Sequence, residues 1–483
     1  MWFPISTLGE QMSIEEEILE EIRNQLKEEK NSDIATLATG FHFKKYTKNG
    51  EIFVPVYEDL MHFFDRKKHY KVLGDSGICY VWHGNHYIEY SDVYIKNFAQ
   101  EMFEPKANNK KVSEFKDLIL RTNLKSHEWF ESTTERKINF KNGILDLDTG
   151  DFYEHSPEFG FRYVLEYDYN PEAQCPIFDK VLKDVTINDN ILAQILLEFA
   201  GYAISSDSCW AHKALILEGS GSNGKSTFMN CLRSLAGRDN YSNLTLSDLK
   251  SEGNRQMLDG RLFNLAEETP AKGLMDSSLF KNLVTGGETI VRQIYKRPYS
   301  MRNRAKMIFA CNELPYTYDT SKGFIRRFII VPFRAYFDPQ SNSFDPHIDQ
   351  KLLLERPGIF NRVYQAYRDL KGRGRFLDSE AVKNAVDDYQ KEINPLLEWV
   401  EDNLDLHEYG NGHDHRCLTV SEIYAEFSSY MKENGYSTIN INLFGRKLRD
   451  VIPDLLKRKS SKRFDNVVKK VLLAVDWKKS EIH

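Results

Sequence analysis

The sequence has few cysteines and no long uncharged apolar run. Its 483 residues include six cysteines, none in a Cys-x-x-Cys pair, so we expect neither a disulfide framework nor a thiolate zinc site. No stretch reaches the roughly 18 apolar residues of a membrane-spanning helix. The first residues carry glutamates where a signal peptide carries bases followed by an apolar run. These absences predict a cytoplasmic protein with reduced thiols and no membrane partner.

The chain also lacks an overall excess of basic charge. Lys and Arg number 65 against 71 Asp and Glu, so the formal net charge of −6 provides no general attraction to nucleic acid. Residues 457–479 are an exception, because they hold nine Lys and Arg against two Asp. Any contact with DNA must therefore be local.

The length and composition predict several globular domains of α/β type. A chain of 483 residues with 41% hydrophobic and 28% charged residues exceeds one core, and we expect two to four domains. Between residues 213 and 333, short buried apolar runs alternate with glycine-containing loops and helices, a pattern typical of a mostly parallel sheet. The predicted divisions are an N-terminal α+β region (1–110), a helical and hairpin region (111–204), an α/β core (205–340), an α-helical segment (341–402) and a basic C-terminal α/β region (403–483).

Two local elements are predicted before the core. Apolar residues alternate around Asp148-Thr149-Gly150, which indicates a hairpin. The stretch from Ile177 to Tyr202 has a helical pattern and is expected to form a helical segment.

A glycine-rich motif begins where a buried strand is expected to end. The run Ala214–Leu217 leads into a match to G-x-x-x-x-G-K-[ST], and a helical pattern follows until Gly237. In this context backbone N–H groups and a helix N-terminus hold phosphates, Lys225 reaches the terminal phosphates, and Ser226 ligates Mg²⁺. A glycine turn with an incidental Lys-Ser is the alternative. The predicted ATP-binding residues are Gly219, Ser220, Gly221, Ser222, Asn223, Gly224, Lys225, Ser226 and Thr227.

Polar side chains follow two further buried strands. Glu267 and Glu268 come after the run Leu262–Ala266, and Asn312 follows the run Met307–Cys311. Ligand sites of α/β sheets lie at the carboxyl ends of strands, and hydrolysis needs an acid for Mg²⁺ and water. We assign Glu267 to the metal and Glu268 to the water, leaving the reverse assignment and a surface Glu pair open. The Asn312 amide is predicted to hold the attacking water or sense the γ-phosphate.

Basic residues occur at two positions near these strands. Arg326 and Arg327 precede a fourth buried strand, where arginine can stabilise the γ-phosphate in cis or from a neighbouring subunit, or else pair with local acids. Residues 285–299 are predicted to form a hairpin with Lys296 and Arg297 at its tip and Arg292 nearby. Such a tip suits the DNA backbone, although a solvated turn would have the same pattern.

The C-terminal region carries two further candidates. His407, His413, His415 and Cys417 have spacings possible for zinc, but Gly410 and Gly412 favour a loop. The basic segment after residue 456 is predicted to form a DNA-binding surface, with a merely solvated surface as the alternative. Its predicted contacts are Lys457, Arg458, Lys459, Lys462 and Arg463.

Taken together, these motifs resemble the superfamily 3, D5-like helicases, namely the helicase part of the phage and plasmid primase family. The matching stretches are GSGSNGKST (219–227), LAEET (265–269), KNLVTGGETIVRQIYKRP (281–298), IFACNELP (308–315) and GFIRRFIIVPF (323–333). The resemblance implies an AAA+-type core, a C-terminal winged helix, a ring of about six subunits with an arginine finger in trans, and pore hairpins on single-stranded DNA. It also implies that Lys281 and Lys296 contact DNA, Asn312 is the sensor, and Arg326 or Arg327 is the finger.

The function predicted from these residues is an ATP-dependent DNA helicase or replication initiator of a mobile genetic element. Its expected partners are single-stranded and forked DNA, duplex origin DNA and further copies in a hexamer, with ATP and Mg²⁺ as cofactors. Only about 110 residues precede the resemblance, without an evident acidic metal pair, so primer synthesis is not expected. The alternatives are an origin-binding ATPase that melts DNA locally and, less favoured, a P-loop small-molecule kinase.

Overall fold

The structure is a computed structural model of the chain. It describes residues 42–47, 50–267, 276–292, 298–312, 314, 317, 319, 321–338, 340, 345–409, 416–433, 438–452, 454–464 and 467–478. The chain divides into two compact units, one of Met1–Thr134 and Glu154–Tyr163, the other of Glu135–Tyr153 and Val164–His483. Within the described part, no helix has both the length and the apolar character needed to cross a membrane.

The first unit contains a four-stranded sheet with the order β5-β4-β3-β6. Its elements are β1 (His42–Thr47), β2 (Gly50–Pro55), α3 (Tyr57–Lys68), β3 (Lys71–Leu73), β4 (Cys79–Trp82), β5 (Tyr87–Glu89), α4 (Asp92–Phe103), α5 (Asn109–Ile119), β6 (Leu124–Lys125) and α6 (His127–Thr134). Successive side chains of a strand point to opposite faces of a sheet. Val72 therefore packs with residues of α3, α4 and α5, whereas Leu73 packs in a second cluster with Phe130 of α6.

The second unit is organised around a five-stranded parallel sheet with the order β11-β12-β15-β10-β16. Its strands are β10 (Ala214–Glu218), β11 (Tyr241–Ser242), β12 (Phe263–Ala266), β15 (Lys306–Cys311) and β16 (Phe328–Pro332). Every residue of β12 and β15 is buried, as expected for strands covered on both faces. The mixed α/β class predicted from the sequence is confirmed.

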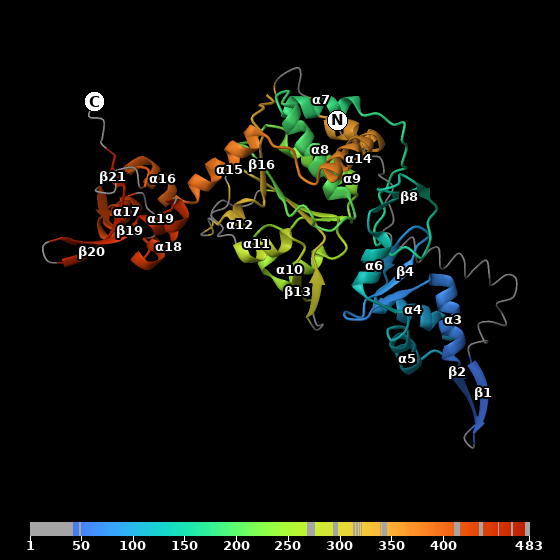
Figure 1. The fold of residues 1–483 in the computed structure, drawn as a ribbon. Coiled ribbons are helices and arrows are strands. Elements are labelled where there is room, and N and C mark those ends of the chain that lie inside the picture. The colour runs from blue at the N-terminus through green and yellow to red at the C-terminus, as the bar shows by residue number, and fades with distance from the viewer. Residues whose placement is uncertain are drawn as a thin grey trace, which may run out of the picture. The chain divides into compact units, whose positions relative to one another are not determined.

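Helices cover this sheet on both sides, as Figure 1 shows. They are α7 (Pro176–Val185), α8 (Asn190–Ile204), α9 (Lys225–Ala236), α10 (Glu252–Arg255), α11 (Ser277–Val284), α12 (Lys322–Ile325), α13 (Ile348–Leu354), α14 (Arg356–Arg373) and α15 (Glu380–Glu392). The predicted helical segment from Ile177 to Tyr202 is two helices. Ile187 and Asn188 take positive φ angles of 51° and 61° between them, and the Asp189 side chain caps α8 by accepting from the amides of the first turn.

Two predicted hairpins are present in the second unit. β7 (Lys137–Phe140), β8 (Gly143–Asp146) and β9 (Phe152–Tyr153) form an antiparallel sheet whose second turn contains Asp148-Thr149-Gly150. β13 (Glu288–Val291) pairs with β14 (Tyr299–Arg302), which confirms the hairpin between the second and third core strands. Its predicted tip residues, Lys296 and Arg297, lie outside the described residues.

The C-terminal part packs helices against short antiparallel strands. Its elements are α16 (Pro395–Asn403), β17 (Leu404–Leu406), β18 (Cys417–Thr419), α17 (Val420–Glu433), α18 (Ile441–Val451), α19 (Leu455–Arg458), β19 (Lys459–Phe464), β20 (Val467–Leu473) and β21 (Val475–Trp477). Buried side chains of α16, α17, α18 and β20 form one apolar core. Figure 1 shows the hairpin β19–β20 extending from this core. Of the suggested zinc residues, His413 and His415 lie outside the described residues, and the described ones form no group that could hold a metal ion.

Candidate nucleotide-binding site

The glycine-rich motif forms the loop between β10 and α9. A Cβ on Gly219 would lie 2.7 Å from the Phe333 carbonyl oxygen, and Gly224 has a φ of 87° and room for no side chain beside Val185. Only glycine fits a left-handed conformation in so tight a position without strain. The loop therefore needs glycine at both positions for its own packing.

Lys225 is the first residue of α9 and is only 8% exposed. Its ammonium donates hydrogen bonds to the Gly219 carbonyl oxygen and, at 3.2 Å, to Asn223 Oδ1. Asn223 Nδ2 in turn donates to the Phe333 carbonyl oxygen at 3.2 Å. Burial lowers the pKa of Lys225. The cation is thus held over the loop, where an anion entering from the pocket would meet it.

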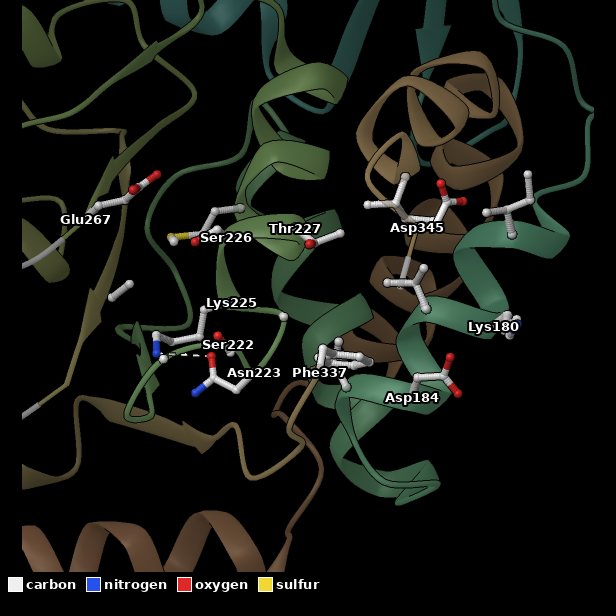
Figure 2. Close-up of a pocket in the computed structure, with 18 of the residues that line it drawn as sticks. Lys180, Asp184, Ser222, Asn223, Lys225, Ser226, Thr227, Glu267, Phe337 and Asp345 are labelled. Carbon is white, nitrogen blue, oxygen red and sulfur yellow. Dashed lines mark hydrogen bonds between the residues drawn. The ribbon is translucent and has the colours of Figure 1, made fainter. Parts of the chain in front are cut away.

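A pocket of about 770 Å³ opens beside this loop. Figure 2 shows the loop residues, Ser226 and Glu267 on one side of it, with α7 on the other. Its lining combines the loop, two strand ends, α7 and the chain that follows β16. The polar and apolar lining residues outside the loop include Lys180, Val181, Asp184, Val185, Glu267, Asn312, Phe337, Asp345 and Lys351.

Glu267 and Asn312 reach this pocket because their strands run parallel to β10. β10 pairs with β15 so that Glu218 lies opposite Cys311, and β12 pairs with β15 so that Ala266 lies opposite Phe309. The residues that follow each strand therefore lie at the same edge of the sheet, as the sequence predicted. Glu268 lies outside the described residues, so the division of roles between the two glutamates stays a prediction.

The Glu267 carboxylate is not isolated at this edge. It forms an ion pair with the Arg233 guanidinium of α9, and the two side chains are 41% and 23% exposed. Arg233 also donates to Asn230 Oδ1 at 2.8 Å, and Asn230 Nδ2 donates to Asp349 Oδ2 of α13 at 2.8 Å. A polar chain thus connects the acid to α13 across one side of α9.

The far wall of the pocket was missed by the sequence analysis. Lys180, Asp184 and Val185 come from α7, and Phe337 follows β16, so no short motif unites them. The apolar and charged residues of α7 recur with helical spacing, but every amphipathic helix has this pattern. The pattern therefore does not indicate that α7 borders a pocket. Only the fold brings this wall opposite the glycine loop.

Arg326 and Arg327 lie at the opposite edge of the sheet from the loop. Ala214, the first residue of β10, pairs with Phe328 and donates its N–H to the Arg327 carbonyl oxygen at 2.8 Å. The five residues of β10 span roughly 16 Å, more than an arginine side chain can bridge. A role for either arginine at the loop of its own chain therefore does not fit this geometry.

The two arginines differ in their surroundings. Arg326 is exposed, and among the described residues its guanidinium forms no ion pair or hydrogen bond. Arg327 is half-buried and donates to the Gly323 carbonyl oxygen of α12, and burial lowers its pKa. Arg326 is thus the candidate that can reach another molecule.

The predicted DNA-binding residues occupy different kinds of position. Lys281 forms an ion pair with Asp319 at 2.8 Å, and this contact together with hydrogen bonds holds the pKa of Asp319 below its usual range despite burial. Arg292 is exposed after β13. In the C-terminal part, Lys457, Lys459 and Arg463 are exposed, whereas Lys462 is half-buried and donates to Cys417 Sγ at 3.4 Å.

Arg458 does not have the place that the sequence predicted. It is 7% exposed and donates to the carbonyl oxygens of Ala474 and His407 at 3.0 and 2.8 Å. Its guanidinium is therefore engaged by backbone carbonyl oxygens, and the prediction that it contacts DNA does not fit this position. Lys469 and Lys470 of β20, which the sequence analysis did not single out, are exposed opposite Lys462 and Ser461.

The fold and this site define a mixed α/β protein with a glycine-loop pocket at the carboxyl edge of a parallel sheet. A family model described as "D5 N terminal like" matches residues 57–187, and a "Family of unknown function (DUF5906)" matches residues 217–327. An Acanthamoeba polyphaga mimivirus protein named "Putative helicase L207/L206" is 24% identical over 330 residues. The match covers 62% of this chain, and the chain spans about a third (33%) of that relative.

Solved structures of the NrS-1 C-terminal region share the fold. One apo structure has a TM-score of 0.53 at 12% identity, and another has 0.53 at 13%; each comparison covers 86% of this chain and 98% of that chain. At such identities the likeness concerns the fold alone. The match of residues 57–187 to the D5-like family model and the similarity to the mimivirus protein confirm the resemblance to D5-like helicases that the motifs predicted.

Proposed function

We propose that the chain is an ATP-dependent DNA helicase or replication initiator with an AAA+-type P-loop core. The observation that carries the proposal is the meeting of the Gly219–Ser226 loop, Glu267 and Asn312 at one pocket. The name of the mimivirus relative supports the helicase activity, and the D5-like match supports a role in replication of a mobile element.

The pocket residues fit ATP with Mg²⁺. The loop precedes the N-terminus of α9, where backbone N–H groups would bind phosphates, and Lys225 supplies the opposing charge. The base and sugar would lie towards α7, beside apolar Val185 and Phe337. Ser226 and Glu267 supply the oxygen ligands that Mg²⁺ prefers, and the bound ion would neutralise charge on the β- and γ-phosphates. Either Glu267 or Glu268 orients water, and Asn312 holds it near the γ-phosphate.

The position of Arg326 supports hydrolysis between subunits. A guanidinium at the amino edge of the sheet cannot serve the loop at the carboxyl edge of its own chain, but it can serve the loop of a neighbour. Repetition of that head-to-tail contact generates a closed ring if the rotation closes. We therefore propose a ring, of six subunits by the family resemblance, with Arg326 as the finger in trans.

Two hairpins are proposed to contact DNA. The segment that joins β13 to β14, which contains Lys296 and Arg297, would grip single-stranded DNA in the ring, together with Arg292, which follows β13, and Lys281 of α11. The hairpin β19–β20 would act as the wing of a C-terminal winged helix on duplex origin DNA. Its exposed basic residues are Lys459, Arg463, Lys469 and Lys470.

DNA-stimulated ATPase activity and strand displacement on a forked duplex test this function. A helicase is expected to hydrolyse ATP faster with DNA and to separate a long duplex. Stimulation without displacement would favour the origin-melting ATPase, and hydrolysis that does not respond to DNA would favour a small-molecule kinase.

Substituting alanine for the four basic residues of the β19–β20 hairpin is expected to weaken duplex binding. The slope of log affinity against log salt concentration should become shallower by about 0.9 for each phosphate that is no longer neutralised.

A further inference from the structure

One face of the sheet in the first unit carries a tryptophan flanked by two lysines. Lys71 is on β3, and Lys125 is on β6, which runs parallel to β3 with Lys125 opposite Leu73. Lys71 is two residues from Leu73, so both lysines share the face on which Leu73 and Tyr80 pack with Phe130 of α6. Their ammonium groups lie 6.0 and 5.1 Å from the ring centroid of Trp129.

These two ammonium groups have no carboxylate partner in the part of the chain that the structure describes. Neither lysine forms an ion pair within 4.0 Å, and Asp75, on the turn after β3, is engaged by His127 at 3.0 Å. Two like charges beside one ring repel each other, and the indole quadrupole offsets only part of that cost. An anionic ligand would offset the remainder.

The aromatic groups extend beyond Trp129. The Trp129 ring makes edge contacts with Phe130 and Tyr87, at centroid distances of 5.0 and 6.2 Å. These two rings support its orientation, and the Trp129 side chain is half-buried. A third cation, Arg162, lies over Tyr80 and Phe130 at 5.7 and 5.4 Å. The face therefore offers a partly exposed flat ring with the two ammonium groups of Lys71 and Lys125 over it. Figure 1 shows α6 beside β4 at this face.

We propose that this face binds single-stranded DNA, with a base stacked on Trp129 and adjacent phosphates on Lys71 and Lys125. Single-stranded DNA repeats a flat base and a negatively charged phosphate, which match the indole ring and the ammonium groups. In a duplex the faces of the bases are stacked on one another and could not reach the indole ring. This site lies within the first unit and uses none of the residues of the ATPase or of the two hairpins. It would hold a strand independently of nucleotide hydrolysis.

The test is photocrosslinking of a 20-residue bromodeoxyuridine oligonucleotide to the full chain without ATP, with the crosslinked peptides mapped by mass spectrometry. The wild type is expected to crosslink at Trp129. Trp129→Leu should reduce oligonucleotide crosslinking to the peptide of residues 127–134 at least fivefold, the lower limit for removal of one base stack, while Trp129→Phe should keep most of it. Lys71→Ala with Lys125→Ala should flatten the salt dependence of that yield by about 1.4 in log–log slope.

The matched control is Lys96→Ala with Lys110→Ala, which removes the same charge from exposed positions on α4 and α5. It should leave the Trp129 crosslink unchanged. Absence of a crosslink at Trp129, or equal losses in the control pair, would overturn the proposal. Competition by thymidine monophosphate as effective as by the oligonucleotide would also overturn it, in favour of a mononucleotide site. Because ATP is absent, an inactive ATPase with an intact Trp129 crosslink would refute the proposed function alone.

Discussion

The charged groups at the two edges of the parallel sheet differ in their burial and in their bonding partners. At the carboxyl edge, Lys225 and Glu267 border an open pocket, and in the part of the chain that the structure describes their side chains bond to the loop and to Arg233 of α9. At the amino edge, Lys306 is fully buried and donates to the carbonyl oxygens of Ser205 and Asp207 at 2.7 and 2.6 Å. The carboxyl edge is arranged for a ligand, and the amino edge is arranged mainly to hold β15 to the helices.

Arg326 is the exception that makes the comparison informative. It lies at the amino edge but does not join the buried network, in which the Asp207 carboxylate accepts from Tyr367 and Lys371 at 2.5 Å each. The exposed guanidinium of Arg326 is therefore available to another molecule. In the proposed ring, the amino edge of one chain would serve the carboxyl edge of its neighbour, and mutations at the two edges test this.

The largest expected effect comes from removing the exposed arginine. Arg326→Ala should lower ATPase turnover by on the order of 10³-fold or more, the usual contribution of an arginine finger. Mixing this variant with Lys225→Ala should restore activity, because a mixed ring can pair an intact loop with an intact finger. Steady-state ATPase assays of the separate and mixed proteins provide the measurement.

Arg327→Ala is the matched control for this experiment. Its guanidinium is bonded to the Gly323 carbonyl oxygen, so we expect a loss of stability with turnover largely kept. No recovery in demonstrably mixed oligomers would contradict a finger in trans. An equal loss in both single variants would assign the segment a structural role.

At the carboxyl edge, Lys225→Ala should reduce turnover by on the order of 10²–10³-fold. The side chain supplies the only cation that the loop itself directs at the phosphates. Because Lys225 is bonded only to loop atoms, the variant should keep its circular dichroism spectrum and its melting temperature within a few degrees. Turnover near the wild-type rate would remove the phosphate-site interpretation.

The buried lysine of the amino edge should give a pH signature. Burial lowers the pKa of Lys306 from its ordinary 10.5 to about 8. Between these values the unfolded chain binds more protons than the folded one, so this contribution to stability rises with pH. Between pH 8 and 10.5, the free energy of unfolding of the wild type should rise by up to about 3 kcal/mol relative to that of Lys306→Met. Urea unfolding at several pH values measures it, with exposed Lys322→Met as control; parallel curves for Lys306→Met would contradict the assignment.

The sequence predicted the carboxyl edge better than the amino edge. The predicted residues of the carboxyl edge each follow a buried apolar run; they are Gly219–Ser226, Glu267 and Asn312. Parallel strands bring the positions after such runs to one edge of the sheet, whatever the order of the strands in the sheet. The wall containing Asp184 and Phe337 needs the tertiary placement of α7, which no local pattern encodes.

Local sequence patterns also failed to predict the break between α7 and α8 and the burial of Arg458, because both depend on the folded structure. The break between α7 and α8 contains neither glycine nor proline, and Ile187 and Asn188 take positive φ angles. Asparagine adopts this region readily, but a β-branched residue such as isoleucine rarely does. Arg458 has the same charge as its neighbour Lys457, and only burial separates a residue that holds the backbone from one that is exposed. Charge can be counted from a sequence, but its accessibility depends on the fold.

The smallest expected effect concerns the ion pair that restrains the carboxyl edge. Arg233 and Mg²⁺ would compete for the Glu267 carboxylate, and an ion pair this exposed contributes roughly 0.2–1 kcal/mol. Arg233→Ala should therefore lower the Mg²⁺ concentration for half-maximal ATPase activity by about 1.5- to 5-fold, with maximal turnover kept. Asn230→Ala, which only removes the link from Arg233 towards α13, should shift it less. A large fall in maximal turnover for Arg233→Ala would instead make the arginine part of the catalytic edge, and the contrast between the two edges would then extend to α9.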